Sequence, residues 1–289
     1  MKGMLVIIHF FAKSKILISS ILIILLLAVA ILVFLCFVYP QLMYELDSVR
    51  NWNRYSVRIY RKDFGSSYFE VLLGHRKIYS CTGEQKFSVE SLGSDVTGNG
   101  VPNLVVSQYL GGAHGKSRYL VLELVGSKVK EVDVIDGIDA EFRDLNNDGL
   151  PEITGIDRGY DFFLGDSFAA SPRPSVVFSF DKTKKKYILD RQLMTKRPFS
   201  LDKLNELSTK YRENARWHKE SRPPSKLFDT MLKLVYSGNK KQAWELFDAS
   251  WPDGANTNIS KEEYKEDVEN ELRRSLFYPV IAGWNKEKS

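Results

Sequence analysis

The chain has 289 residues, of which 44% are hydrophobic and 27% charged, and its formal net charge is +5. This composition excludes an intrinsically disordered chain, and two cysteines are too few for a small disulfide-rich scaffold. The positive charge is uneven, because residues 1–40 contain three lysines and no acid, whereas the rest of the chain carries 38 basic and 36 acidic side chains. We therefore expect no nucleic-acid partner, and the length allows one or two domains.

An uncharged apolar run at residues 16–38 predicts a transmembrane anchor. A helix of this length spans about 34 Å, which is enough for a hydrocarbon core of about 30 Å. The alternative is a cleaved signal peptide, whose apolar region is usually only about 7–15 residues long. Ala28 and Ala30 form the small-x-small pattern of a cleavage site. Cleavage after this pattern would leave an apolar stretch at the new N-terminus, which favours an uncleaved anchor.

The flanks of this run predict its orientation. Lys2, Lys13 and Lys15 precede it, and positive residues favour the cytoplasmic side. We expect a cytoplasmic tail at 1–15 and a juxtamembrane linker at 39–53. The predicted location is the bacterial inner membrane, with one helix in contact with membrane lipid and the C-terminal bulk in the periplasm or otherwise outside the cytoplasm.

Residues 54–198 predict a β-rich domain. Runs rich in Val, Ile, Leu, Tyr and Phe alternate with clusters of Gly, Asn, Asp and Pro, which is typical of strands and turns. The expected strands are Ser56–Tyr60, Tyr68–Leu73, Lys77–Ser80, Leu104–Gln108, Tyr119–Leu124, Val129–Val134 and Val176–Phe180. The lysine-rich run 182–186 is expected to be an exposed hairpin tip.

Residues 199–289 predict an α-helical region, so the expected fold class is α+β. The first helix follows Ser200, and Leu201, Leu204 and Leu207 have helical spacing. A second is expected after Pro224, with Ser225 as its cap, and a third after the Gly238-Asn239 turn. Ser260 with Glu263 forms a capping box that predicts a last helix reaching about Leu276.

The β-rich region contains a weak internal repeat. Asp95-Val-Thr-Gly-Asn-Gly-Val-Pro-Asn103 aligns with Asp144-Leu-Asn-Asn-Asp-Gly-Leu-Pro-Glu152, and a hydrophobic run follows each copy. The two copies begin at residues 95 and 144, and a strand-rich unit repeated at this spacing predicts blade-like β meanders. The region has room for about three such units, fewer than the 4–8 blades of a typical closed propeller. We therefore expect a partial β assembly.

The second copy of this motif predicts a calcium site. Calcium binds 6–8 oxygen atoms, and alternate side chains of a tight loop converge on one centre, while Gly149 permits the turn. The predicted ligands are the side chains of Asp144, Asn146, Asp148 and Glu152 and the carbonyl of Leu150. Asp157 or Asp161 is a candidate for a further ligand. Position 12 is Gly155, so the loop is not an EF-hand.

The alternative interpretation of the second copy is a plain Asn/Asp/Gly turn held by its own side-chain hydrogen bonds. The first copy has only one carboxylate, Asp95, because Thr97, Asn99 and Asn103 are neutral. Too little negative charge is present there to compensate for the dehydration of a divalent cation. We expect the first loop to keep the turn without the ion.

The pattern Asp-x-Asn-x-Asp-Gly-x-x-Glu between short strands resembles the FG-GAP or VCBS repeat. Residues 95–115 and 140–174 are similar to a group of uncharacterised bacterial exported or membrane-anchored proteins with FG-GAP-like loops. This resemblance implies β repeats with calcium-stabilised loops, together with binding of a ligand or partner, and it carries no reaction over to named residues. Relatives often have cysteines after Gly-Gly-Ala-His, whereas Gly115 follows His114 here.

The C-terminal region also resembles a single tetratricopeptide-like hairpin. The match consists of Tyr236, Gly238, Ala243, Phe247 and Pro252. A helical solenoid needs at least about three repeats. We therefore interpret the hairpin as a helical cap that packs on its neighbours.

Catalytic motifs are poorly represented in the chain. It contains no His-Glu-x-x-His, Cys-x-x-Cys or phosphate-loop sequence. Gly165-Asp166-Ser167-Phe168 resembles the nucleophile block of GDSL hydrolases, but the late Asp-x-x-His of that class is missing. We expect a binding or envelope-scaffold module with an unidentified envelope partner or ligand. The alternatives are an envelope hydrolase with a pocket near His114 and residues 157–161, and a helical partner-docking module.

Overall fold

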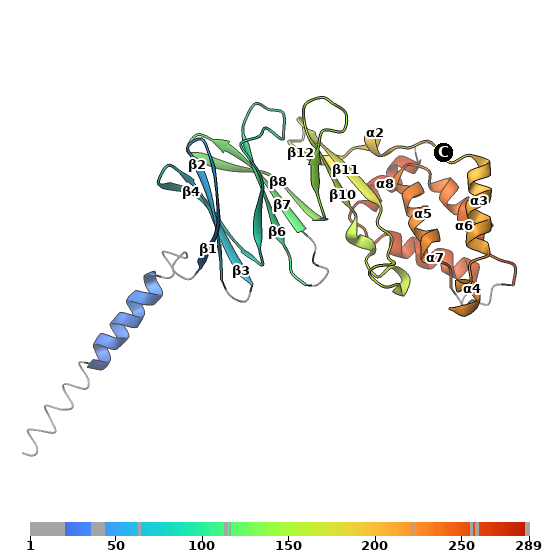
Figure 1. Ribbon diagram of the computed structural model, residues 1–289, viewed down its shortest axis with the longest axis horizontal. Coiled ribbons are helices and arrows are strands. Elements are labelled where there is room, and N and C mark those ends of the chain that lie inside the picture. Colours follow the sequence, from blue (N-terminus) through green and yellow to red (C-terminus); the bar gives the residue numbers. More distant parts are fainter. Residues whose placement is uncertain are drawn as a thin grey trace, which may run out of the picture. The chain divides into compact units, whose positions relative to one another are not determined.

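The computed structural model describes residues 21–35, 44–62, 65–112, 115, 117–220, 222–254, 257 and 260–286. The side chains of residues 218, 285 and 286 are not described. The chain divides into two compact units, Met1–Phe87 and Ser88–Ser289. The described residues form both helices and antiparallel strands, so the fold class is α+β, as expected (Figure 1).

Residues 21–35 are helical, and their large apolar side chains are exposed. The rest of the predicted anchor 16–38 and the predicted tail 1–15 lie outside the described residues. Within the part of the chain that the structure describes, no helix is both long enough and apolar enough to cross a membrane.

The first unit contains a four-stranded sheet whose strands are neighbours in chain order. They are β1 (Glu45–Trp52), β2 (Tyr55–Arg61), β3 (Ser66–Leu73) and β4 (Arg76–Glu84). Two-residue turns at Asn53-Arg54 and Gly74-His75 join β1 to β2 and β3 to β4. Asn53 and Gly74 have positive φ angles of 49° and 60°, which these residue types adopt readily and tight hairpins require.

The structure differs from the expected linker 39–53, because β1 occupies most of it. β1 pairs with β2 through its backbone, while Leu46 and Val49 remain 55% and 41% exposed. An edge strand of this kind buries little apolar surface, so its sequence lacks the alternation that marks a half-buried strand.

The second unit contains two more four-stranded sheets, again with neighbouring strands in chain order. One consists of β5 (Phe87–Leu92), β6 (Asn103–Tyr109), β7 (Ser117–Val125) and β8 (Lys128–Ile138). The other consists of β9 (Glu141–Arg143), β10 (Glu152–Ile156), β11 (Ser175–Asp181) and β12 (Lys186–Leu189). All seven expected strands are confirmed, and the lysine-rich run lies at the turn between β11 and β12.

Seven helices follow the sheets within the described residues. They are α2 (Arg191–Met194), α3 (Leu201–Arg212), α4 (Arg216–Lys219), α5 (Ser225–Tyr236), α6 (Lys240–Ser250), α7 (Lys261–Leu272) and α8 (Tyr278–Lys286). The caps at Ser200 and Ser260 are confirmed, the latter as a full capping box. Two boundaries were wrong: Pro224 and not Ser225 is the cap of α5, and α7 ends at Leu272, after which the turn to α8 begins.

One hydrophobic core joins the two sheets of the second unit to its helices. The helices group beside the β9–β12 sheet (Figure 1). Ring contacts cross this junction: Phe178 of β11 lies 5.3 Å from Phe277, and Phe163 lies 5.2 Å from Phe228 of α5, measured between ring centroids. The compact units therefore do not coincide with the expected boundary between residues 198 and 199, because the helices and the preceding strands share one interior.

Candidate functional site

The two copies of the sequence repeat occupy equivalent places in their sheets. The Asp95 loop, residues 95–102, connects β5 to β6, and the Asp144 loop, residues 144–151, connects β9 to β10. Each loop thus joins the first and second strands of a four-stranded meander. The repeat is therefore present in the topology as well as in the sequence.

A single carboxylate organises the Asp95 loop. Its Oδ1 accepts hydrogen bonds from the backbone N–H groups of Thr97, Gly98 and Asn99 at 3.1, 2.7 and 3.3 Å. Its Oδ2 accepts one from Gly100 at 2.7 Å. Burial by itself would raise the pKa of Asp95, but these four N–H donors outweigh burial and hold the pKa below its ordinary value of 3.8.

The Asp95 loop is also tied to the strands below it. Asn103 Oδ1 accepts a hydrogen bond from Val96 N at 2.8 Å, and the Asn99 amide donates to Glu123 Oε1 at 2.6 Å. Glu123 in turn pairs with Lys130 at 3.3 Å. The neutral residues Asn99 and Asn103 thus act as hydrogen-bonding residues of a closed turn.

The Asp144 loop repeats this backbone pattern with more acids. Asp144 accepts hydrogen bonds from Asp148 N at 3.2 Å and Gly149 N at 3.0 Å. Asp148 Oδ1 accepts from Leu150 N at 2.8 Å, and Asn146 Oδ1 accepts from Asp148 N at 2.9 Å. The loop therefore has the side-chain-to-backbone hydrogen bonds that the alternative interpretation, a plain turn, requires.

Glu152 brings a third carboxylate to this loop from the start of β10. Its side chain is buried, with Oε2 accepting from Leu145 N at 2.8 Å. The Asn146 amide nitrogen lies between two acids, because it donates to Glu152 Oε1 at 3.1 Å and to Asp148 Oδ2 at 2.9 Å. The structure therefore links all four predicted side-chain ligands into one hydrogen-bonded group, with an amide nitrogen between two of the carboxylates.

The three acids of the Asp144 loop have no basic partner among the described residues. Their neighbour Arg143 pairs with Glu141 at 2.6 Å. The described residues contain no group of three or more His, Cys, Asp or Glu side chains already arranged as metal ligands. The donor set nevertheless fits a hard cation, because it consists of carboxylate and amide oxygens with a net charge of −3.

The two loops contact each other. An added Cβ at Gly98 would overlap the Leu150 side chain, so the Asp95 loop approaches the Asp144 loop closely at this glycine. Tyr187 of β12 donates its hydroxyl to Val96 O at 2.7 Å. Burial raises the pKa of Tyr187, and the nearby charges of Asp133, Asp95 and Glu152 raise it further. Tyr187 thus lies within electrostatic range of both loops.

The two candidates for a further ligand lie elsewhere. Asp157 is buried, and the hydroxyls of Tyr236 and Ser275 donate to its Oδ2, while Gly159 N donates to Oδ1 at 2.7 Å. Asp161 forms an ion pair with the buried Arg158 at 2.8 Å. Asp157 therefore joins β10 to α5 and to the turn after α7, and neither acid belongs to the Asp144 loop.

The described acids considered for an enzyme are each paired with other side chains. Asp166 of the GDSL-like block is buried in ion pairs with Arg216 and Arg222. Three hollows of the second unit are lined by α3, by β11 with α2 and α5, and by β9–β11, and none of these three is lined by Asp157 or Asp161. His114, the remaining residue of the hydrolase hypothesis, lies outside the described residues.

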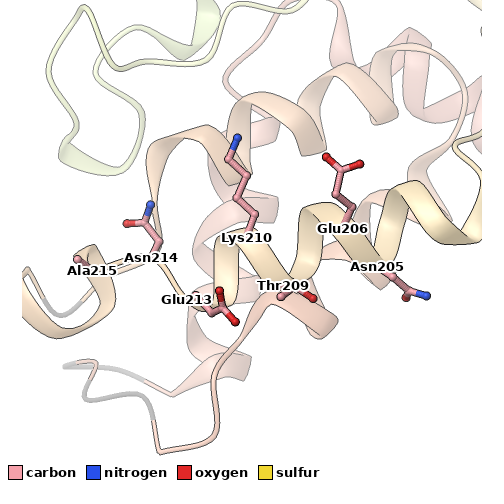
Figure 2. A pocket seen from close by; sticks show the side chains of 7 residues that line it. All are labelled: Asn205, Glu206, Thr209, Lys210, Glu213, Asn214 and Ala215. Carbon is pink, nitrogen blue, oxygen red and sulfur yellow. The ribbon is translucent and has the colours of Figure 1, made fainter.

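The hollow at α3 has a volume of about 790 Å³ and is lined by polar side chains. Figure 2 shows Glu206 and Lys210 on one side of α3 and Glu213 on the other, so the three side chains do not point toward one centre. A catalytic or ligand site requires polar groups that converge. This hollow is therefore an open helix surface, and it does not combine with the Asp144 loop.

Comparisons with known proteins add no relative. No protein-family model matches the chain, and neither a curated protein nor a solved structure was found to be similar to it.

Proposed function

We propose that the chain is a membrane-anchored, extracytoplasmic binding or scaffold protein whose FG-GAP-like β domain is stabilised by calcium at the Asp144 loop. The observation that carries this proposal is the hydrogen-bonded group of Asp144, Asn146, Asp148 and Glu152, which gathers three acids without a basic partner among the described residues. The four-stranded meanders, each in chain order, support the blade-like part of the proposal.

Calcium would be held by the side-chain oxygens of these four residues and by the Leu150 carbonyl. The Asn146 amide nitrogen now places partial positive charge between Asp148 and Glu152. A bound cation would supply that charge in full, with the amide turned to offer its oxygen, and would relieve the repulsion among the three acids. Its role would be structural: to hold the Asp144 loop rigid against the Asp95 loop at the Leu150–Gly98 contact.

A binding or scaffold role is preferred to hydrolysis because the described polar clusters are internally paired. Asp157 accepts from Tyr236 and Ser275, and Asp166 pairs with Arg216. Membrane attachment through residues 16–38 rests on the uncharged apolar run in the sequence. In this proposal the paired loops present a rigid surface to an envelope partner.

Thermal melting of the purified full chain with excess calcium or with a chelator tests this function. A calcium concentration well above the dissociation constant should stabilise the folded chain by about 1–3 kcal/mol, which raises the melting temperature by roughly 3–10 °C. Asp148→Asn keeps an acceptor for Leu150 N but removes one negative charge and the acceptor of the Asn146 amide, so it should abolish the calcium shift, which is measured against the same variant in chelator.

Asp181→Asn is the matched control for this experiment. Asp181 also accepts turn hydrogen bonds, from Thr183 N at 2.8 Å and Lys184 N at 2.9 Å, but it lies at the lysine-rich hairpin. Its variant should keep the full calcium shift. An equal melting temperature of the wild-type chain in calcium and in chelator would overturn the calcium proposal and favour the plain turn.

A further inference from the structure

A second, chemically distinct hollow lies at the junction of β11, α2 and α5. It has a volume of about 370 Å³, which is at the small end of the range for small-molecule sites. Its apolar lining is contributed by the side chains of Val177, Leu193, Met194, Phe199, Leu234 and Tyr236. We refer to it as the α2–α5 cleft.

The charged side chains that line the α2–α5 cleft are all positive. Lys196, Arg197 and Lys233 line it, and no Asp or Glu does. Lys233 forms an ion pair with Asp229, with 2.9 Å between Nζ and Oδ2. Neither Lys196 nor Arg197 takes part in an ion pair with any described residue, so two basic groups beside an apolar hollow are uncompensated.

The wall that carries these two cations is held in place at both ends. Lys196 N donates to Ser237 O at 3.2 Å, and the Asn239 amide donates to Lys196 O at 3.1 Å. At the other end the Gln242 amide both accepts from Phe199 N at 2.8 Å and donates to Phe199 O at 2.9 Å. Between the two clamps, Pro198 restricts its own φ angle and the conformation of Arg197. The cleft is therefore preformed.

We propose that the α2–α5 cleft binds a small amphiphilic carboxylate, with its apolar chain among the lining residues and its head group on Lys196 and Arg197. Charge complementarity selects the anion, because an apolar hollow alone would accept a neutral molecule equally well. The limited volume and the clamped wall suit a medium-chain fatty acid better than a peptide segment. This site is separate from the Asp144 loop and extends the proposed binding function.

Decanoate binding to the full chain, measured by isothermal titration calorimetry at low ionic strength, tests the proposal. Wild-type protein should bind one decanoate saturably, and decanol at least tenfold more weakly. The double variant Lys196→Gln/Arg197→Gln should weaken decanoate binding at least fivefold and leave the melting temperature unchanged, since both side chains are exposed. The matched control Lys182→Gln/Lys185→Gln removes the same charge at the β11–β12 turn and should leave decanoate binding unchanged.

The proposal fails if decanoate does not bind saturably, if decanol binds equally well, or if both double variants weaken binding to the same extent. Asp148→Asn separates this site from the calcium loop, because it should retain decanoate binding whether or not calcium binds. Loss of decanoate binding in Asp148→Asn would also contradict the proposed site.

Discussion

At the scale of single residues, the ionisation of Asp95 makes the stability of the first repeat loop depend on pH. Its folded-state pKa lies below the ordinary value because four backbone N–H groups point at its carboxylate. A depressed folded-state pKa stabilises the protein fully above the pKa of the unfolded chain, and this stabilisation is lost as pH falls through the lower folded-state pKa. The Asp95 loop should therefore weaken only in acid.

Asp95→Asn should remove this pH dependence. The amide keeps one acceptor oxygen, so the variant should lose about 1 kcal/mol of unfolding free energy near neutral pH. The difference from wild type should shrink as pH falls below the ordinary Asp95 pKa of 3.8, because the protonated wild-type side chain loses the same hydrogen bonds. Urea unfolding at a series of pH values measures this. A difference that stays constant down to the lowest accessible pH would contradict the account.

At the scale of elements, the two repeat loops act on each other through Gly98 and Leu150. Gly98 and Gly100 both have positive φ angles, of 65° and 81°, and both N–H groups donate to Asp95. Only Gly98 lies against Leu150, whereas a Cβ at Gly100 would meet nothing within 4 Å. The two glycines therefore form a matched pair that separates backbone strain from the contact between loops.

Gly98→Ala should destabilise the chain more than Gly100→Ala. Each substitution places alanine in the left-handed region, at a cost of about 1–2 kcal/mol, and only the first also pushes Leu150 aside. Adding Leu150→Ala to Gly98→Ala should recover part of the difference. Chemical unfolding of the three variants provides the measurement, and equal losses at the two glycines would rule out a loop–loop contact.

The elements that could be predicted are those whose burial produces a recognisable pattern of apolar residues in the sequence. β6 and β7 read as apolar runs because they are buried almost throughout, and the capping box at Ser260 is a local signal that needs no tertiary context. β1 and β9 are exposed or only three residues long, so they depend on pairing with β2 and β10 and leave no periodic trace.

The residues and contacts of the candidate site were likewise only partly predictable from the sequence. The spacing of acids in residues 144–152 predicts a set of calcium ligands, which stays a prediction; the structure adds the hydrogen bonds that join Asn146 to Asp148 and Glu152. The Gly98–Leu150 contact and the Tyr187 hydroxyl bond to Val96 were not predictable, because each joins residues more than 50 positions apart. The cations of the α2–α5 cleft were missed for a similar reason: Lys196 and Arg197 carry no motif, and only the fold places them beside β11 and α5.

At the scale of the whole molecule, the helical region is part of the interior of the second unit. Phe178 contacts Phe277, Phe163 contacts Phe228, and Tyr236 donates to the buried Asp157. Each of these pairs crosses the expected boundary at 198/199. The second compact unit therefore extends from Ser88 through the helices.

Fragments test this division. Residues 88–289 should unfold in one cooperative transition, because they contain the complete core of the second unit. Residues 88–198 should fail to fold, since large apolar side chains lose their partners and Asp157 loses two hydroxyl donors, a total that exceeds the ordinary domain stability of about 5–15 kcal/mol. Circular dichroism melting measures both. A cooperative transition of 88–198 at the temperature of 88–289 would restore the boundary at 198/199.

The central claim concerns the three acids of the Asp144 loop, and counting bound calcium by equilibrium dialysis tests it most directly. The wild-type chain and Asp95→Asn should each bind one ion per chain at millimolar calcium, whereas Asp148→Asn should bind none, because of the two repeat loops only the Asp144 loop has three carboxylates for a divalent cation. No bound ion in the wild-type chain, or equal binding by wild type and Asp148→Asn, would contradict the account.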